Sequence, residues 1–486
     1  MKKINIALIA ALLVAFASAG FAETAPAGQN KELSEDNWVE LAQKYELPAA
    51  KTKILAKPTP ELVASWWNAF GDETLTNLIT SALRNNRDMA VARAKVKEAR
   101  AMLGGSKARL YPWIDADGMW GKGRKPVHLG GDTNTHESFS LGVDASWEID
   151  IFGGRRADID AAVKGVEAQY AALHSAWVTL SSEVAINYIS LRAYQSRLEV
   201  AKKNLALQQD MHDMLQSQYD SGLIDTLALS QEKYVLEQTK ASIPPIESAI
   251  EQLKNALAVL TGEIPGSLED SLSVRRAIPE AAELTLVGIP ADALRQRPDI
   301  RYAERTLMAQ MARKKSAQKD LWPKFFLFGS IGTESLTSGS LFEGANKSHS
   351  WGPKISWPIF HWGAIKNNIR VQGAKQEQLL AVYEQTVLSA VAEVRNALTE
   401  NIQERDRNAS LKRAVAAAQI ALETSTDKYR NGLTDFNNVI TAQKAVLSLT
   451  DQLIVSEGAI SSNIVKIFKS IGGGWQPLAE EVKAGI

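Results

Sequence analysis

The 486-residue sequence contains no cysteine. This absence excludes disulfides, thiolate metal ligands, cysteine nucleophiles and a lipid attached through an N-terminal cysteine. An excess of charge of one sign is also absent, because 55 lysines and arginines balance 55 aspartates and glutamates. No net field therefore favours nucleic acid, and we expect no nucleic-acid partner.

Catalytic patterns are absent as well. The histidines include no pair four residues apart, and no glycine-rich phosphate loop follows a predicted strand. His128 and His136 lie in one predicted loop, where histidines are more often solvated than bound to metal. We therefore expect no catalytic residue, no cofactor, no metal site and no enzymatic activity.

Long apolar runs are scarce, and the run at the start of the chain has the pattern of an export signal. Two lysines precede an apolar run at residues 6–16, which small residues up to Ala22 follow. This order predicts a secretory signal peptide at residues 1–22, with cleavage after Ala19 or an uncleaved anchor as alternatives. Beyond it, no stretch of about 18 apolar residues predicts a membrane helix, but alternating membrane strands stay possible because they give no hydropathy peak.

The sequence from residue 83 onward is repeated from residue 294 onward. The first stretch matches at an offset of 211 and the later stretches at an offset of 210, as 299 − 88 and 357 − 147 illustrate. The matched pairs are Asp88 and Asp299, Pro112 and Pro323, Gly118 and Gly329, Trp147 and Trp357, Gly153 and Gly363, Tyr219 and Tyr429, and Gly222 and Gly432.

An offset held over so long a stretch indicates two copies of one structural unit. We predict a first repeat at residues 83–284 and a second at residues 285–474. A segment at residues 23–82, which contains the first helix, precedes them, and a tail at residues 475–486 follows.

Each repeat is expected to contain two strands, at about residues 110–121 and 137–150 in the first and 321–332 and 348–360 in the second. The second strand of each pair alternates apolar and polar residues and has a tryptophan near the end of its apolar face. This pattern suits a tilted membrane strand, although Pro353 and Pro358 each remove one ladder donor; a soluble sandwich sheet is the alternative. Four strands cannot close a membrane barrel, so spanning strands would have to be pooled by several chains.

Each repeat is also expected to contain two long helices, at about residues 154–218 and 225–261 in the first and 364–428 and 435–470 in the second. The first has no proline, and its apolar residues recur in heptads, which predicts a narrow packed seam with both other faces wet. A plain coiled-coil rod is the alternative. Pro244 and Pro245 predict a break in the first return helix, whereas the second return helix is expected to be continuous.

Four phrases of the sequence resemble the TolC family of outer membrane factors, in particular its NodT-type outer membrane efflux proteins. They are Trp66-Trp67-Asn68-Ala69-Phe70-Gly71-Asp72, Ser146-Trp147-Glu148-Ile149-Asp150-Ile151-Phe152-Gly153, Ile289-Pro290 with Arg297-Pro298-Asp299-Ile300, and Gly472-Gly473-Gly474-Trp475. The resemblance, which covers about residues 60–475, implies a mixed α and β fold. It further implies a homotrimer with a shared 12-stranded transmembrane β-barrel, a periplasmic α-helical coiled-coil barrel and an equatorial collar.

The resemblance also implies a location in the outer membrane with a large periplasmic part. There the chain would be the passive exit channel of a tripartite efflux pump. Its partners would be a periplasmic adaptor (membrane fusion) protein, an inner-membrane RND-type or related transporter and outer membrane lipid. A periplasmic coiled-coil scaffold without channel activity is the alternative function.

By the same resemblance, the turns at residues 219–225 and 429–435 are the periplasmic tips. Their local chemistry is that of helix ends, because glycine suits a left-handed C-cap and aspartate suits the next N-cap. The predicted adaptor contacts are Tyr219, Gly222, Leu223, Tyr429, Gly432 and Leu433. The predicted gate residues are Asp225, Arg430, Asp435, Thr441 and Lys444.

Overall fold

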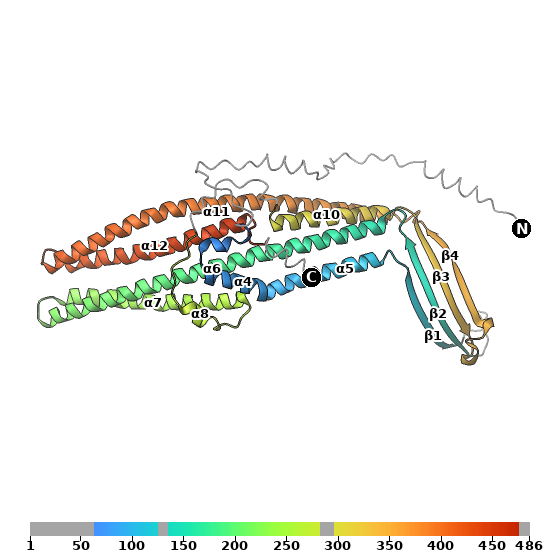
Figure 1. The fold of residues 1–486 in the computed structure, drawn as a ribbon, viewed down its shortest axis with the longest axis horizontal. Helices are drawn as coiled ribbons and strands as arrows, with labels where there is room; N and C mark the ends of the chain where they lie inside the picture. Colours follow the sequence, from blue (N-terminus) through green and yellow to red (C-terminus); the bar gives the residue numbers. More distant parts are fainter. Residues whose placement is uncertain (1–62, 125–134, 282–295, 476–486) are drawn as a thin grey trace. The chain divides into compact units, whose positions relative to one another are not determined.

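The computed structural model describes residues 63–124, 135–281 and 296–475 (Figure 1). The predicted signal peptide, most of the segment at 23–82, His128, and residues 476–486 of the predicted tail lie outside the described residues. After a short 3-10 helix at Trp66–Phe70 and helix α4 (Glu73–Asn85), the same order of elements occurs twice. The first series is α5 (Arg87–Ala108), β1 (Trp113–Gly123), β2 (His136–Ile149), α6 (Gly154–Asp220) and α7 (Thr226–Thr261), after which α8 (Glu269–Ser273) follows.

The second series repeats this order. It consists of α10 (Pro298–Lys319), β3 (Lys324–Ser335), β4 (Lys347–Ser356), α11 (Ala364–Arg430) and α12 (Phe436–Ser470). Two short 3-10 turns, Ser338–Ser340 and Gly344–Asn346, lie between β3 and β4. The chain is therefore mostly helical with one small sheet, which is the mixed α and β fold that the sequence predicts.

The four strands form one antiparallel sheet in the order β1-β2-β3-β4. In β2, Val143 pairs with Ala116 of β1 on one side and with Ile331 of β3 on the other, so apolar positions share a face. The opposite face carries Asp144 between Asp115 and Ser330. β4 ends at Ser356, short of the expected residue 360, because β3, its one neighbour among the described strands, begins at Lys324, the partner of Ser356.

Helix α6 is more deeply buried than the heptad pattern predicts. It contacts α4, α5, α7, α10 and α12, and between residues 173 and 193 buried positions surround most of its circumference. They include Trp177, Ser181, Tyr188 and Arg192. The prediction of two wet faces is therefore wrong for this part of the helix, since neighbours distant in sequence bury one of them, while Glu183 on the other is exposed. The narrow seam does describe α11, where Tyr383, Val387, Ala390, Val394 and Ala397 are buried.

The prediction that Pro244 and Pro245 break the first return helix is also wrong. Helix α7 runs through both prolines, from Thr226 to Thr261. The prolines still remove two backbone donors, but Ile243 is buried and Ile246 packs against the main core. Side-chain packing on both sides of the prolines thus holds the helical path.

The main hydrophobic core brings the first and last described residues together. Trp66 stacks on Phe468 of α12 with ring centroids 5.7 Å apart. The backbone N–H of Gly474 donates to the carbonyl of Val63 at 2.9 Å, and a side chain on Gly473 would meet that carbonyl at 2.9 Å. The glycine-rich phrase near the end of the chain therefore lets its backbone pack against the tryptophan-rich phrase near its beginning.

Two further residues of the recognised phrases hold this region. Asp72 caps α4 by accepting from the N–H groups of Thr74 and Leu75, and it also accepts the hydroxyl of Tyr188 at 2.6 Å. The buried Arg297 donates to the carbonyl of Ser470 and forms ion pairs with Asp299 at 2.8 Å and with Glu393 at 2.7 Å. It thereby ties α10 to α11 and to the end of α12.

Candidate functional site

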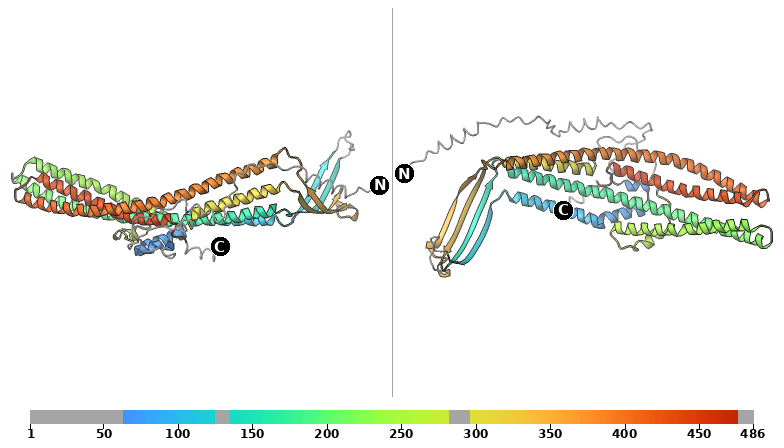
Figure 2. Two further views of the ribbon diagram at one scale, coloured as in Figure 1. Left: turned by 90° about the horizontal axis from the view of Figure 1, so that it is seen from above. Right: turned by 180° about the vertical axis from the view of Figure 1, so that it is seen from behind.

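The two helical turns lie at the same end of the long helices, away from the sheet (Figures 1 and 2). Gly222 and Gly432 have φ of 71° and 70°, the left-handed conformation that glycine adopts without strain. The N–H of Leu223 donates to the carbonyl of Gln218 at 2.9 Å, and Leu433 repeats this bond to Lys428 at 2.8 Å. This is a glycine-terminated helix end, and it leaves Leu223 and Leu433 75% and 74% exposed.

The two aspartates that follow the turns behave differently. Asp225 caps α7 through an oxygen that accepts the N–H of Ala228 at 3.1 Å. The prediction that Asp435 caps α12 in the same way is wrong, because its side chain makes no cap bond and Asn438 donates to its backbone carbonyl instead. Asp435 and Arg430 are exposed, and neither forms an ion pair within the described chain.

The remaining predicted tip residues make contacts within the chain. The hydroxyl of Tyr429 donates to Gln218 at 3.5 Å and so joins the two turns, while its ring lies 5.1 Å from that of Phe436. Lys444 places its ammonium 4.9 Å from the ring centre of Tyr234 on α7. Thr441 donates to the carbonyl of Asn437 at 2.8 Å. Tyr219 is exposed. Packing brings Tyr429 and Lys444 against the first repeat, whereas Thr441 bonds only within α12.

Sequence reasoning missed a buried carboxyl group near the tips. Glu232 of α7 is 0% exposed, and neither of its oxygens has a hydrogen-bond partner. Leu229 and Val235, one turn to either side, belong to a small hydrophobic core shared with Leu215 and Val439. Burial raises the pKa of Glu232 to about 7, because the ionised form has lost its water. Glu232 lies three residues after the apolar Leu229 and three before the apolar Val235. This position on the apolar face of the helix is the sequence signal that could have revealed its burial.

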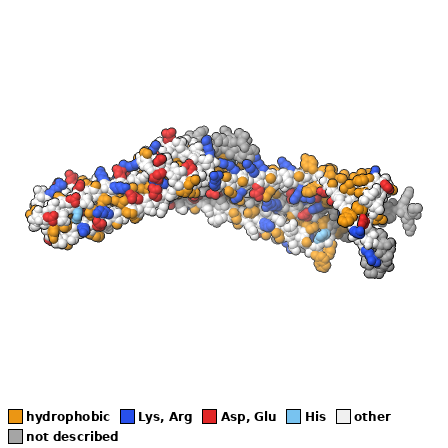
Figure 3. All heavy atoms as spheres, turned by 90° about the horizontal axis from the view of Figure 1, so that it is seen from below, with side chains coloured by type: hydrophobic (Ala, Val, Ile, Leu, Met, Phe, Trp, Pro, Cys, Tyr) orange, Lys and Arg blue, Asp and Glu red, His pale blue; other side chains and the backbone are white. Residues whose placement is uncertain are grey.

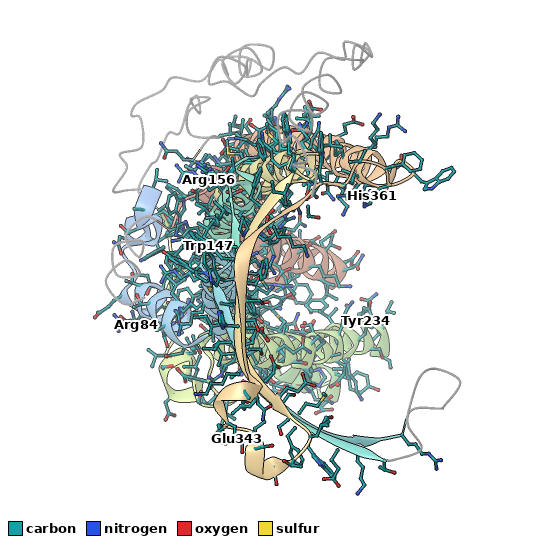
Figure 4. The ribbon with its side chains drawn as sticks, turned by 90° about the vertical axis from the view of Figure 1, so that its right-hand side faces the viewer. Arg84, Trp147, Arg156, Tyr234, Glu343 and His361 are labelled. Atoms are coloured by element: carbon teal, nitrogen blue, oxygen red, sulfur yellow. The ribbon has the colours of Figure 1, made fainter. Side chains whose placement is uncertain are left out.

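At the other end of the helices, equivalent tryptophans fix the junction between helix and strand. Trp147 of β2 donates from Nε1 to the carbonyl of Leu110 at 2.7 Å, and Trp357 donates to that of Leu321 at 3.2 Å. In Figure 4, Trp147 lies close to the sheet, and His361 stands to the other side. The two junctions are therefore built in the same way in both repeats.

A charged cavity of about 340 Å³ lies where the strands meet α6, α10 and α11. Its lining includes Arg155, which pairs with Glu148 at 2.6 Å, and Lys324, which pairs with Asp320 at 2.9 Å. Asp150 accepts the N–H groups of Arg155 and Arg156 and so supports the start of α6. Acidic and basic side chains are balanced along this lining. The ion pairs indicate that the region connects the strands to the helices.

Neither metal chemistry nor a membrane helix emerges from the described part of the chain. No group of three or more histidine or acidic side chains in it is placed to hold a metal ion. None of the helices in the same part is both long and apolar enough to cross a membrane. Hydrophobic side chains instead gather on the surface at the end that carries the strands (Figure 3).

Known proteins share this arrangement of sheet, long helices and tips. The chain is 31% identical to the cation efflux system protein CusC of Escherichia coli O6:H1 over 85% of this chain and 89% of that protein. It is 28% identical to nodulation protein T of Rhizobium leguminosarum bv. trifolii, over 87% and 90%. The structure of the outer-membrane channel OprN is similar, with a TM-score of 0.80 and 33% identity over 89% of this chain and 98% of that one.

The sequence model of the family described as "Outer membrane efflux protein" matches residues 78–263 and 289–473. The two matched ranges correspond to the two series of elements. The chain is thus an outer membrane protein with a large periplasmic helical part and serves in efflux. It belongs to the outer membrane efflux protein family.

Proposed function

We propose that three copies of this chain form the passive exit channel of a tripartite efflux pump. One observation carries this proposal: the described residues form a four-stranded sheet in which no strand of theirs pairs with the outer edges of β1 and β4. A strand edge in lipid leaves backbone polar groups unsatisfied, so the sheet must be closed by further copies. Three copies would supply twelve strands.

The exposed side chains of the sheet support placement in lipid. Ile114, Val143, Ile331 and Ile355 lie on one face and are all exposed in the single chain, Val143 the least. Water disfavours so large an apolar face, whereas a bilayer accommodates it. Trp147 and Trp357 lie near the helical end of this face, where amphipathic rings suit a membrane interface.

We further propose that the tips are where the channel meets its adaptor and where it closes. The exposed Leu223 and Leu433 offer apolar contacts to a periplasmic adaptor protein, which would join the channel to an inner-membrane transporter of the RND type or a related class. Arg430 and Asp435 are exposed and have no ion-pair partner in the described chain, so each is available to pair with a neighbouring copy. Such pairs across copies would hold the helix ends together.

The channel performs no chemistry in this proposal, and the transporter selects the cargo. Relatives of similar identity are named for different cargoes: CusC for cations at 31% identity and a solvent efflux pump protein of Pseudomonas putida at 27%. One channel architecture thus serves chemically unlike cargoes. The energy for export would also come from the transporter.

Purified protein in planar lipid bilayers tests the proposal. We expect heat-resistant trimers in outer membranes and a small single-channel conductance that rises in Arg430→Ala and Asp435→Ala. Lys428→Ala, another cation in the last turn of α11, is the matched control and should leave conductance unchanged. A soluble periplasmic species without conductance would reject the channel, and unchanged conductance in both tip variants would reject only the gate.

A further inference from the structure

The two hairpins of the sheet have the same register. In the first, Ile114 lies opposite Ala145, and in the second, Phe325 lies opposite Ile355. The offsets found in the sequence, 211 for the first strand of each hairpin and 210 for the second, convert one pair into the other. The tryptophan–carbonyl bonds of the two junctions follow the same offsets. The hairpins are therefore equivalent residue by residue.

The seam between the hairpins shows how one repeat joins the next. Strands β2 and β3 pair with Ile149 opposite Phe325. Just beyond the strands, Phe152 of the first repeat stacks on Trp322 of the second, with ring centroids 5.0 Å apart, and lies 6.3 Å from Phe325. This aromatic cluster closes the inner seam at the point where the strands meet the helices.

The outer edges of the sheet carry the counterparts of this cluster apart from one another, and Trp362 lies 5.3 Å, between ring centroids, from Phe360 of its own chain. By the same offsets, Trp362 corresponds to Phe152, Tyr111 to Trp322 and Ile114 to Phe325. Trp362 is 89% exposed and Tyr111 is 69% exposed. Trp362 also has φ of 47°, the only positive φ of a non-glycine residue in the described ranges, and L-residues with a side chain adopt this conformation only under strain. The packed Phe152 shows no such strain.

We propose that the outer seam between copies repeats the inner seam, with β4 of one copy pairing with β1 of the next in the register Ile359 opposite Ile114. The register follows from the inner pair of Ile149 and Phe325. Adding the offset of 210 to Ile149 gives Ile359, and subtracting the offset of 211 from Phe325 gives Ile114. In the same seam Trp362 packs on Tyr111 of the next copy. This inference rests on the proposed trimer and deepens it by assigning the residues that meet.

The neighbouring helices support the same arrangement. At the inner seam α6 approaches α10 so closely that a side chain on Gly154 would lie 3.3 Å from Cβ of Lys319. The corresponding outer pair is Ala364 at the start of α11 and Ala108 at the end of α5, and both are exposed. At the inner seam the small residue glycine faces lysine, and at the outer seam alanine would face alanine. Both pairs therefore allow the two helices to approach closely.

Disulfide cross-linking tests the register, and the native chain has no cysteine to interfere. Opposed residues in antiparallel strands have Cα atoms about 4.5–5.5 Å apart, which a disulfide can bridge. Oxidised outer membranes containing Ile114→Cys/Ile359→Cys should yield most of the chain as a covalent trimer that reductant dissolves. The control Ile114→Cys/Trp357→Cys keeps both residues on the same face but two positions out of register, and should stay monomeric on denaturing gels.

The outcomes separate the register from the trimer itself. If the control pair cross-links, the register is wrong. The register is also wrong if neither pair cross-links in a chain that still forms a heat-resistant trimer. Either result would leave the proposed channel standing. Absence of any trimer of the native chain would overturn both. If the first pair prevents assembly, Gly118→Cys/Ile355→Cys belongs to the same register and must cross-link. Tyr111→Ala should then lower the temperature at which the native trimer dissociates, and an unchanged temperature would reject the aromatic contact.

Discussion

Glu232 gives the chain a stability that depends on pH in a direction opposite to that of ordinary paired carboxylates. Burial raises its pKa from 4.5 to about 7, and burial is the only cause. No titratable group of the described residues supplies Glu232 with a hydrogen bond or an ion pair. Ionisation is therefore opposed without compensation.

The size of the effect follows from the two pKa values. A difference of about 2.5 between the folded and unfolded chain corresponds to roughly 3 kcal/mol. Below pH 4.5 both states carry the proton, and the group costs nothing. As pH rises from 4.5 to about 7, the unfolded chain loses its proton first, so the folded state loses stability. Above pH 7 the full cost remains.

The variant Glu232→Gln removes the charge and keeps the shape. We expect it to match the native chain near pH 4 and to exceed its local stability by roughly 3 kcal/mol at pH 8. Hydrogen exchange of α7 amides, corrected for intrinsic rates, measures this difference. Glu237→Gln, an exposed position on the same helix that pairs with Lys240 at 2.9 Å, is the matched control and should behave like the native chain. Equal pH dependence in native and Glu232→Gln protein would refute the reasoning.

Four other substitutions test the packing described above. Gly432→Ala should destabilise the tip by about 1 kcal/mol because φ is positive there. Gly165→Ala, inside α6 with open space around it, should stabilise that helix by about 1 kcal/mol. Hydrogen exchange near each position measures both effects. Trp147→Phe loses the bond to Leu110, and the junction should weaken by about 1 kcal/mol in thermal unfolding. Arg297→Met leaves Asp299, Glu393 and the carbonyl of Ser470 without their cation and should cost about 3 kcal/mol in urea unfolding. A loss below about 1 kcal/mol would show that solvent replaces Arg297.

The sheet was predictable because its signals are local. Alternation along β2 specifies which side chains share a face, and its tryptophan and the glycine that follows place the end of β2. Similarly, Gly222 and Gly432 predict the turns, because a left-handed helix end needs no distant partner. The end of β4 is different, since a strand extends only as far as a neighbour pairs with it.

The errors concern contacts between residues far apart in the sequence. The burial of α6 depends on α4, α10 and α12, which no heptad within α6 can indicate. Likewise, the path of α7 through Pro244 depends on packing that outweighs two lost hydrogen bonds. The small core that takes up Leu229 and Val235, on either side of Glu232, includes Phe436 and Val439 of α12, about two hundred positions along the chain.

The contact between Val63 and Gly474 constrains the order of events during synthesis. Two residues more than four hundred positions apart share a backbone bond, and Phe468 supplies the surface on which Trp66 stacks. A growing chain cannot close this core until α12 and the glycines that follow it have been synthesised. The residues around Trp66 must therefore wait for α12 before their core is complete, and a truncation that removes α12 should leave Trp66 without the ring on which it stacks.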